Sequence, residues 1–277
     1  MEPGAPNAGA IAAAPRLSIV TVVKDDLAAL EATLASTRAL SGWDYEHWVI
    51  DGSRQPDVRE ALMRRGGVNW ISEPDQGIFH AMNKGLERAR GDFLLFLNAG
   101  DVISSALDPA ALFARLAVER RALIGHTIEV YQDLRWLRPG VKRAADVFSS
   151  PAHQATFYPR SFYAHNRYPE QLHFSADGAY TLRAIRECGA AYLPLVVCEF
   201  QLGGVSSNYQ SARVLRRRMR EVASLRQQGL LLLKFCLWRI LPRRAFYSLL
   251  AAFKYTRLDR NRIPKLQADS LSRPAER

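Results

Sequence analysis

The chain has 277 residues, 48% of them hydrophobic and 23% charged, which excludes an intrinsically disordered protein and predicts a packed core. Since a single hydrophobic core stops growing at roughly 250 to 300 residues, we expect one domain with an appendage. The formal net charge of +11 is unevenly spread: residues 201–277 carry 17 Lys and Arg against 4 Asp and Glu, and residues 1–200 carry 21 against 23. The basic C-terminal part favours an anionic membrane surface over a nucleic-acid groove.

The N-terminus and the cysteines both predict a cytoplasmic protein. Residues 1–15 lack a basic segment and carry Glu2 and three prolines, so we expect a flexible leader and not a signal peptide. The three cysteines, Cys188, Cys198 and Cys236, show no CxxC spacing, and they imply neither a disulfide framework nor a zinc site.

Strands and helices alternate through the first hundred residues. Residues 17–23 (LSIVTVV) are apolar and β-branched, as in strands buried on both faces of a sheet. Leucines at helical spacing predict a helix over residues 25–38. Further strands are expected at 47–50, 68–72 and 93–97, and further helices at 57–65 and 77–90. Repeated units of this kind predict a doubly wound parallel sheet with ligands bound beyond the carboxyl ends of its strands.

Beyond residue 122 the pattern is less regular. We expect a strand at 122–130, a hairpin through Trp136 and Pro139, a helix at 176–187 and a strand at 191–197. This half would form the second substrate's side of the cleft.

Three aspartates follow predicted strands: Asp51, Asp75 and Asp101. A doubly wound sheet would bring them to one edge, where carboxylates hold a hydrated divalent cation or hydrogen-bond a base and a ribose. Each alone also fits a turn or a helix cap.

Several segments, in order, resemble glycosyltransferases of family 2 with the GT-A fold, especially bacterial enzymes of exopolysaccharide, colanic-acid and O-antigen assembly. They are LSIVTVVKDD, WVIDGS, SEPDQGIFHAMNKGLERARGDFLLFLNAGD, HQATFYPRSFY, SADGAYTLRAI and GGVS. The resemblance implies an α/β, Rossmann-like domain over residues 16–208, with a mixed, mostly parallel sheet flanked by helices. A leader (1–15) would precede it, and a tail of basic amphipathic helices (209–277) would follow.

The resemblance also assigns the donor site. Thr21 and Asp51 would line the nucleobase and ribose pocket, and Asp75 with Asn83 would shape the nucleotide side of the cleft. Asp101 would approach the metal and the diphosphate.

The metal motif departs from the commoner family pattern. Where many members carry Asp-x-Asp-Asp, this chain has Asn98-Ala99-Gly100-Asp101, so one carboxylate remains and Asn98 adds a neutral carbonyl. We expect Mg²⁺ or Mn²⁺ to rely mainly on the diphosphate oxygens.

For the acceptor side, the resemblance makes Asp177 the general base that deprotonates a sugar hydroxyl; its simpler interpretation is a helix N-cap. His153 and Gln154 would contact the diphosphate or the acceptor, although a lone histidine is often structural. Ser206, beside Gly203 and Gly204, would belong to a closing loop or to a plain turn.

The tail combines arginines with apolar segments. Lys234 and Arg239 interrupt its apolar run below the length needed to span a bilayer, so we expect the tail to lie on a membrane. Arginines 213–220 would hold diphosphate or lipid headgroups. Aromatic residues would seat in the interfacial layer: Phe235, Trp238, Phe246, Tyr247 and Phe253. The alternative is a helical hairpin packed on the domain with a solvated basic face.

The resemblance implies a hexosyltransferase-type enzyme that moves a sugar, with inversion, from a nucleoside diphosphate to a glycan or polyprenyl-diphosphate-linked acceptor. It would build cell-surface polysaccharide at the inner face of the plasma membrane, with no nucleic-acid partner. One alternative is a nucleotidyltransferase, whose Gly-rich phosphate loop is missing where the first strand leads into Lys24-Asp25-Asp26. The other is a catalytically impaired GT-A-like module that docks on membrane or RNA through its tail.

Overall fold

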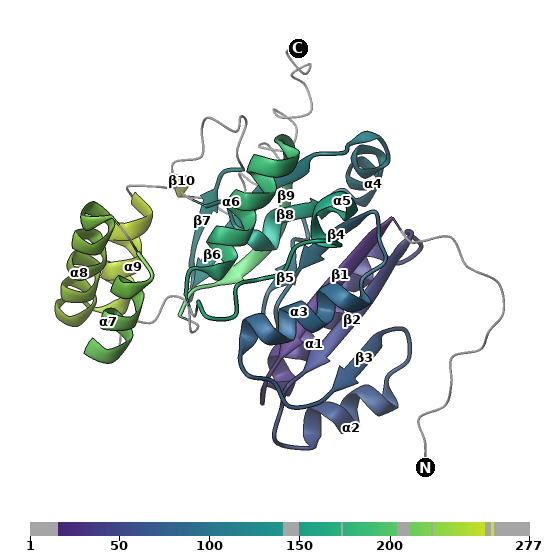
Figure 1. The fold of residues 1–277 in the computed structure, drawn as a ribbon, viewed down its shortest axis with the longest axis horizontal. Coiled ribbons are helices and arrows are strands. Elements are labelled where there is room, and N and C mark those ends of the chain that lie inside the picture. The colour runs from purple at the N-terminus through teal and green to yellow at the C-terminus, as the bar shows by residue number, and fades with distance from the viewer. Residues whose placement is uncertain are drawn as a thin grey trace.

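The computed structural model describes residues 16–140, 150–172, 174–203, 211–222, 224–252 and 256–257. Their strands form one mixed sheet in the order β10-β7-β6-β8-β4-β1-β2-β3, with β9 paired to β6 and β5 paired to β9 (Figure 1). The predicted leader and Ser206 lie outside the described residues.

The N-terminal half is parallel, as predicted. Its strands are β1 (Leu17–Val23), β2 (Tyr45–Asp51), β3 (Asn69–Ser72) and β4 (Phe93–Phe96). They are connected by α1 (Leu27–Ser36), the 3-10 helix η1 (Thr37–Leu40), α2 (Asp57–Arg64) and α3 (Ile78–Arg88). Val23 pairs with Asp51, and Asp51 pairs with Ser72, so the carboxyl ends of β1, β2 and β3 are level.

The second half departs from the doubly wound parallel sheet that the βα repeats predict. Strand β8 (Thr156–Pro159) inserts antiparallel between β4 and β6 (Ala122–Tyr131), and β6 forms a hairpin with β7 (Leu134–Arg138). The remaining elements are β5 (Val102–Ile103), α4 (Pro109–Val118), the 3-10 helix η3 (His153–Ala155), α5 (Arg160–Tyr163), α6 (Ala176–Cys188) and β9 (Ala190–Gln201). Among the strands described in this half, β6 and β9 are the parallel pair, with irregular register around His126.

Side chains alternate across the sheet into two apolar layers, because successive residues of a strand face opposite sides. Leu17 and Ile19 join the layer that contains α4, whereas Val20 and Val22 join the layer that contains α3 and α6. Helix α3 lies very close to β1: a Cβ added at Gly85 would lie 2.3 Å from a methyl of Val20. The sheet thus forms a rigid support for the loops at its carboxyl edge.

The tail forms α7 (Ala212–Arg220), α8 (Leu225–Ile240), α9 (Arg243–Ala252) and β10 (Thr256–Arg257). Figure 1 shows the three helices grouped at one end of the molecule, and β10 pairs with β7. Arg244 forms an ion pair with Asp133, at 2.8 Å, beside the β6–β7 hairpin. Within the described residues, none of the helices combines the length and the apolar character that crossing a membrane requires.

The expectation that the tail's aromatic residues face a membrane is wrong for those described. Trp238, Phe246 and Tyr247 are buried in a cluster with Leu134 and Trp136 of β7, and Phe235 packs against that cluster. Phe253 lies outside the described residues. The aromatic side chains therefore attach the tail to the sheet.

Candidate active site

Asp51 is the last residue of β2, and its carboxylate is held at the edge of the sheet. One oxygen accepts a hydrogen bond from the Ser53 amide at 2.9 Å, and the other accepts one from the Ser72 hydroxyl at 2.8 Å. The side chain is buried. Bonds from two neighbouring strand ends therefore fix its position.

Asp75 follows β3 and lies beside Asp51. Its carboxylate accepts from the Gly77 amide at 2.9 Å and forms an ion pair with Lys24 Nζ at 3.2 Å. A Cβ added at Gly52 would lie only 1.7 Å from Asp75 Oδ2, so the carboxylate rests against the backbone of the residue after Asp51. Asp51, Asp75 and Lys24 thus converge from three strand ends. Sequence reasoning missed Lys24, although it directly follows the first strand.

Thr21 and Asn83, which were predicted to belong to the nucleotide site, use their side chains for contacts within the protein. The Thr21 hydroxyl is fully buried, where it donates to the Leu97 carbonyl at 2.7 Å and contacts His47 Nε2 at 2.8 Å. The Asn83 amide donates to Glu170 Oε1 at 2.7 Å and accepts from the Tyr168 amide at 2.8 Å. These contacts brace the strands and the loop around the site, and they give no support to a direct contact with a nucleotide.

The turn from Asn98 to Asp101 follows β4 and is bonded to α1. Gly100 has a φ of +94°, which glycine adopts without strain, and its amide donates to Thr33 Oγ1 at 2.9 Å. The Thr33 hydroxyl in turn donates to the Asp101 carbonyl at 2.8 Å. These bonds hold the backbone of Asp101 just after the carboxyl end of β4, at the same sheet edge as Asp51, because β2, β1 and β4 are adjacent parallel strands.

Asp101 is nearly fully buried, and burial raises the pKa of its carboxyl to about 7. The charge of His153 and a hydrogen bond from Gln154 act in the opposite direction but do not outweigh burial. Gln154 therefore contacts the predicted metal residue, and the Asp101 carboxyl is poised to change charge near neutral pH.

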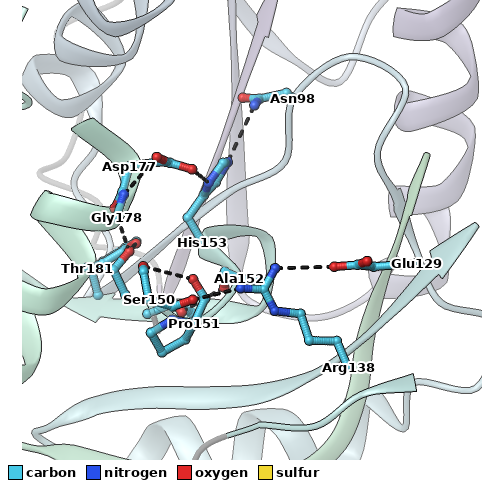
Figure 2. A network of polar contacts seen from close by, with 12 residues as sticks. Asn98, Glu129, Arg138, Ser150, Pro151, Ala152, His153, Asp177, Gly178 and Thr181 are labelled. Atoms are coloured by element: carbon cyan, nitrogen blue, oxygen red, sulfur yellow. Dashed lines mark hydrogen bonds and ion pairs between the residues drawn. The ribbon is translucent and has the colours of Figure 1, made fainter. Parts of the chain in front are cut away.

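His153 connects this turn to Asp177 (Figure 2). His153 Nδ1 lies 3.4 Å from Asp177 Oδ2, and Nε2 lies 3.4 Å from the Asn98 amide nitrogen. Asp177 is in the first turn of α6 and accepts from the Gly178 amide at 2.7 Å. Its side chain is 36% exposed, so one face of the carboxylate remains open to a substrate.

The electrostatic surroundings keep Asp177 ionised. Burial tends to raise the pKa of its carboxyl, but the hydrogen bond and charge of His153, the Gly178 amide and the charge of Arg138 together hold that pKa below its usual value. Arg138, at the end of β7, donates to the Ser150 carbonyl at 2.7 Å and to Glu129 at 3.3 Å (Figure 2). Sequence reasoning missed Arg138, because only the register of the β6–β7 hairpin brings it here.

Glu221, also missed, holds the segment before Asp177 from the end of α7. Its Oε2 accepts from the Phe174 amide, the Ser175 amide and the Ser175 hydroxyl at 2.9 to 3.1 Å. Nearby, the Arg218 guanidinium lies 4.6 Å over the Phe174 ring. The tail is thus bonded to the segment that carries the predicted base, and Arg218 is buried there instead of facing a ligand.

The oxygen atoms around Asp101 allow a test of the expected divalent cation. Within the described residues, no group of three or more His, Cys, Asp or Glu is arranged to hold a metal ion. Asn98 Oδ1 and Asp101 Oδ2, however, are buried oxygens without a hydrogen-bond partner, and Mg²⁺ and Mn²⁺ prefer oxygen ligands. These residues fit a cation that takes most of its ligands from a diphosphate and water.

The overall architecture is that of solved glycosyltransferases. TarS of S. aureus in complex with UDP-GlcNAc superposes with a TM-score of 0.54 at 16% identity, covering 92% of this chain and 79% of that one. The mannosyltransferase PcManGT of Pyrobaculum calidifontis, solved with GDP-Man and Mn²⁺, gives a TM-score of 0.53 at 15% identity, covering 94% and 74%. At these identities the likeness establishes the fold alone.

Sequence relatives extend the comparison. A Mycobacterium tuberculosis (strain ATCC 25618 / H37Rv) protein named as an uncharacterized glycosyltransferase is 32% identical over 215 residues, covering 73% of this chain and 80% of the relative. A PGL/p-HBAD biosynthesis glycosyltransferase of Mycobacterium bovis (strain BCG / Pasteur 1173P2) is 27% identical over 217 residues, covering 74% and 84%. The family model described as glycosyl transferase family 2 matches residues 18–189. The chain therefore belongs to glycosyltransferase family 2 and is a glycosyltransferase with the GT-A fold.

Proposed function

We propose that this glycosyltransferase moves a sugar from a nucleoside diphosphate to an acceptor hydroxyl with inversion, and that Asp177 is its general base. The observation that carries the proposal is the imidazole of His153, which contacts both Asp177 and the Asn98–Asp101 turn. The proposed base for the acceptor and the turn whose oxygens would hold the cation and the diphosphate therefore both lie next to His153. Sugar transfer needs both, because the base activates the incoming hydroxyl while the cation stabilises the leaving diphosphate.

On the donor side, Asp51 and Asp75 would accept hydrogen bonds from the base and the ribose. Both carboxylates are already oriented by amide donors, so binding would cost little reordering. Lys24 Nζ, paired with Asp75 and about half exposed, would offset the negative charge of the nucleotide. Structural neighbours solved with UDP-GlcNAc or GDP-Man support a nucleotide-sugar donor of this general kind.

Asn98 and Asp101 would hold Mg²⁺ or Mn²⁺ through the two unpartnered oxygens, together with the diphosphate. When bound, the cation would neutralise charge that develops on the leaving diphosphate. Asp101 must be ionised to serve as a ligand, so cation binding would release its proton at neutral pH. Gln154 would orient the carboxylate through its hydrogen bond.

On the acceptor side, Asp177 would take the hydroxyl proton as the bond from the acceptor oxygen to the anomeric carbon forms. His153 Nδ1 donates toward one carboxylate oxygen and would fix the direction in which the base points. Attack from the face opposite the diphosphate would invert the anomeric centre. Arg138 helps to keep Asp177 in its charged form.

The acceptor would be a glycan or a polyprenyl-diphosphate-linked sugar at the cytoplasmic membrane face, within the synthesis of a cell-surface polysaccharide. The basic tail supports this placement, because exposed arginines on α7 and α8 would attract an anionic surface. Glu221 bonds the tail to the segment that carries Asp177. A tail held at the membrane would therefore keep the proposed base close to a lipid-linked acceptor.

A donor screen with a lipid-linked acceptor extract tests the proposal. We expect the wild type to release nucleoside diphosphate from one donor class in the presence of Mg²⁺ or Mn²⁺, and Asp177→Asn to lose this release. Asp57→Asn, at an exposed position at the start of α2, is the matched control and should behave as the wild type. Donor binding without turnover in the wild type would instead indicate a binding module, and release of pyrophosphate would indicate a nucleotidyltransferase.

A further inference from the structure

Helix α8 is apolar on two opposite faces, and only one of them is covered. Leu231, Phe235 and Trp238 face the cluster on β7. Five large aliphatic side chains of α8 are exposed: Leu225 at 84%, Leu230 at 49%, Leu232 at 49%, Leu233 at 54% and Ile240 at 77%. At 100° per residue, all of these positions except Leu230 fall on one stripe along the helix, away from the cluster on β7. We call it the outer stripe.

Exposed apolar side chains that stand singly are common, but a contiguous stripe of them marks an interaction surface. The outer stripe runs the whole length of α8, from its first residue to its last. Since α7 and α9 leave it uncovered, it has no role in the packing of the described tail. Anything that covers the stripe would have to come from outside the described residues.

The helix that carries the stripe and the helix before it are both rich in exposed arginines. Arg226 and Arg239 are exposed on α8, and further exposed arginines lie on α7 at Arg213, Arg216 and Arg220. Within the described residues 211–252, Glu221 is the one acidic residue, and its carboxylate is bonded to Phe174 and Ser175. Apolar side chains between arginines are typical of helices that lie in the interface of an anionic bilayer.

We propose that the outer stripe of α8 inserts into the boundary between headgroups and acyl chains of an anionic bilayer, with the arginines of α7 and α8 on the lipid phosphates. A second copy of the chain would bring an equally cationic surface against this one, which like charges oppose. A nucleic acid would match the arginines but not the leucines. The inference deepens the membrane placement proposed above by naming the surface, and it does not depend on catalysis.

Vesicle flotation tests the stripe. Full-length protein is mixed with phosphatidylcholine vesicles, with or without phosphatidylserine, at matched salt. We expect the wild type to float with the anionic vesicles and L232E/L233E to bind them roughly 10-fold more weakly or worse. The matched control is M63E/V118E, which adds the same two charges at positions 65% and 71% exposed on α2 and α4. It should float nearly as the wild type does.

Several outcomes would overturn the proposal. Wild-type protein that stays with the unbound fraction, or L232E/L233E that floats like the wild type, would do so. Equal loss in both double variants would show that net charge alone drives binding. A wild-type dimer that L232E/L233E converts to monomer, without a change in flotation, would make the stripe a contact between copies.

Two further measurements keep the test independent of folding and of the proposed catalysis. L225E/I240E changes the two most exposed stripe positions, where a fold effect is least expected, and must reproduce the loss of flotation. Nucleoside diphosphate release from a soluble donor should be unchanged in both stripe variants. A stripe defect with normal release supports the membrane surface, whereas failure of release in the wild type would concern only the proposed transfer.

Discussion

The imidazole of His153 lies 3.4 Å from the Asp177 carboxylate through Nδ1 and 3.4 Å from the Asn98 amide through Nε2. Because a carboxylate only accepts, Nδ1 must carry the proton in this contact. In the tautomer that carries its proton on Nδ1, Nε2 accepts from the Asn98 amide, so this tautomer satisfies both neighbours. His153 thereby sets the direction of the proposed base relative to the turn that would hold the diphosphate.

Replacing His153 should therefore change both rate and pH dependence. We expect His153→Gln to lower kcat by about 10- to 100-fold, because the base loses its orientation. His153 lowers the pKa of Asp177, so the acid limb of the kcat/KM profile should move to higher pH in the variant. His165→Gln, at an exposed site after α5, is the control. A slower enzyme with an unmoved acid limb would mean that His153 is only structural.

Two buried groups should give opposite pH dependences of stability. Burial raises the pKa of Asp101 to about 7, so its contribution is full below its unfolded value of 3.8 and is lost as pH rises through 7. Burial lowers the pKa of His47 to about 3, so its contribution is full above 6.5 and is lost as pH falls toward 3.

Free energies of unfolding, measured in urea with a chelator between pH 4.5 and 6.5, separate these groups. Relative to the wild type, Asp101→Asn should gain stability as pH rises, and His47→Gln should gain stability as pH falls. Each difference should change by at most roughly 1.4 kcal/mol per pH unit. Asp101→Asn should also lose activation by Mg²⁺ or Mn²⁺, whereas His47→Gln should keep it. Differences that do not vary with pH would show that these groups titrate normally in the folded state.

The close contact between Gly52 and Asp75 gives a prediction for the donor site. A methyl group at Gly52 would displace the Asp75 carboxylate, so Gly52→Ala should raise the Kd for the donor by about 10-fold or more. Gly66→Ala is the control, because the added methyl would meet no atom within 4 Å. Donor titration by calorimetry measures both. An unchanged donor affinity in Gly52→Ala would remove Asp75 from the nucleotide side of the cleft.

The parallel half of the fold was predictable from sequence, because continuous β-branched runs and helical leucine spacing are local signals. The carboxyl ends of its strands then place Asp51, Asp75 and Asp101 on one edge without further information. The antiparallel insertion of β8 was not predictable, since short apolar segments do not encode their partners. This insertion determines where His153 lies in the candidate site, because η3, which carries His153, immediately precedes β8.

Long-range contacts account for the residues that sequence reasoning missed. Glu221 reaches Ser175 across 46 positions, and Arg138 reaches the site only through strand register. Helix α8 was ambiguous for another reason: both of its faces are apolar, so periodicity cannot tell which one packs on β7. Only the aromatic cluster in the fold shows that Trp238 faces inward and Leu232 outward.

The most direct test of the account is single-turnover sugar transfer by Asp177→Asn, with donor affinity measured on the same protein. If Asp177 is the general base, the transfer rate should fall by about 100-fold or more. Donor affinity should stay within about twofold of the wild type, since Asp177 is proposed to act on the acceptor and not on the nucleotide. The product of the wild type should carry the inverted anomeric configuration. Near-normal transfer by Asp177→Asn, or a product with retained configuration, would contradict the account.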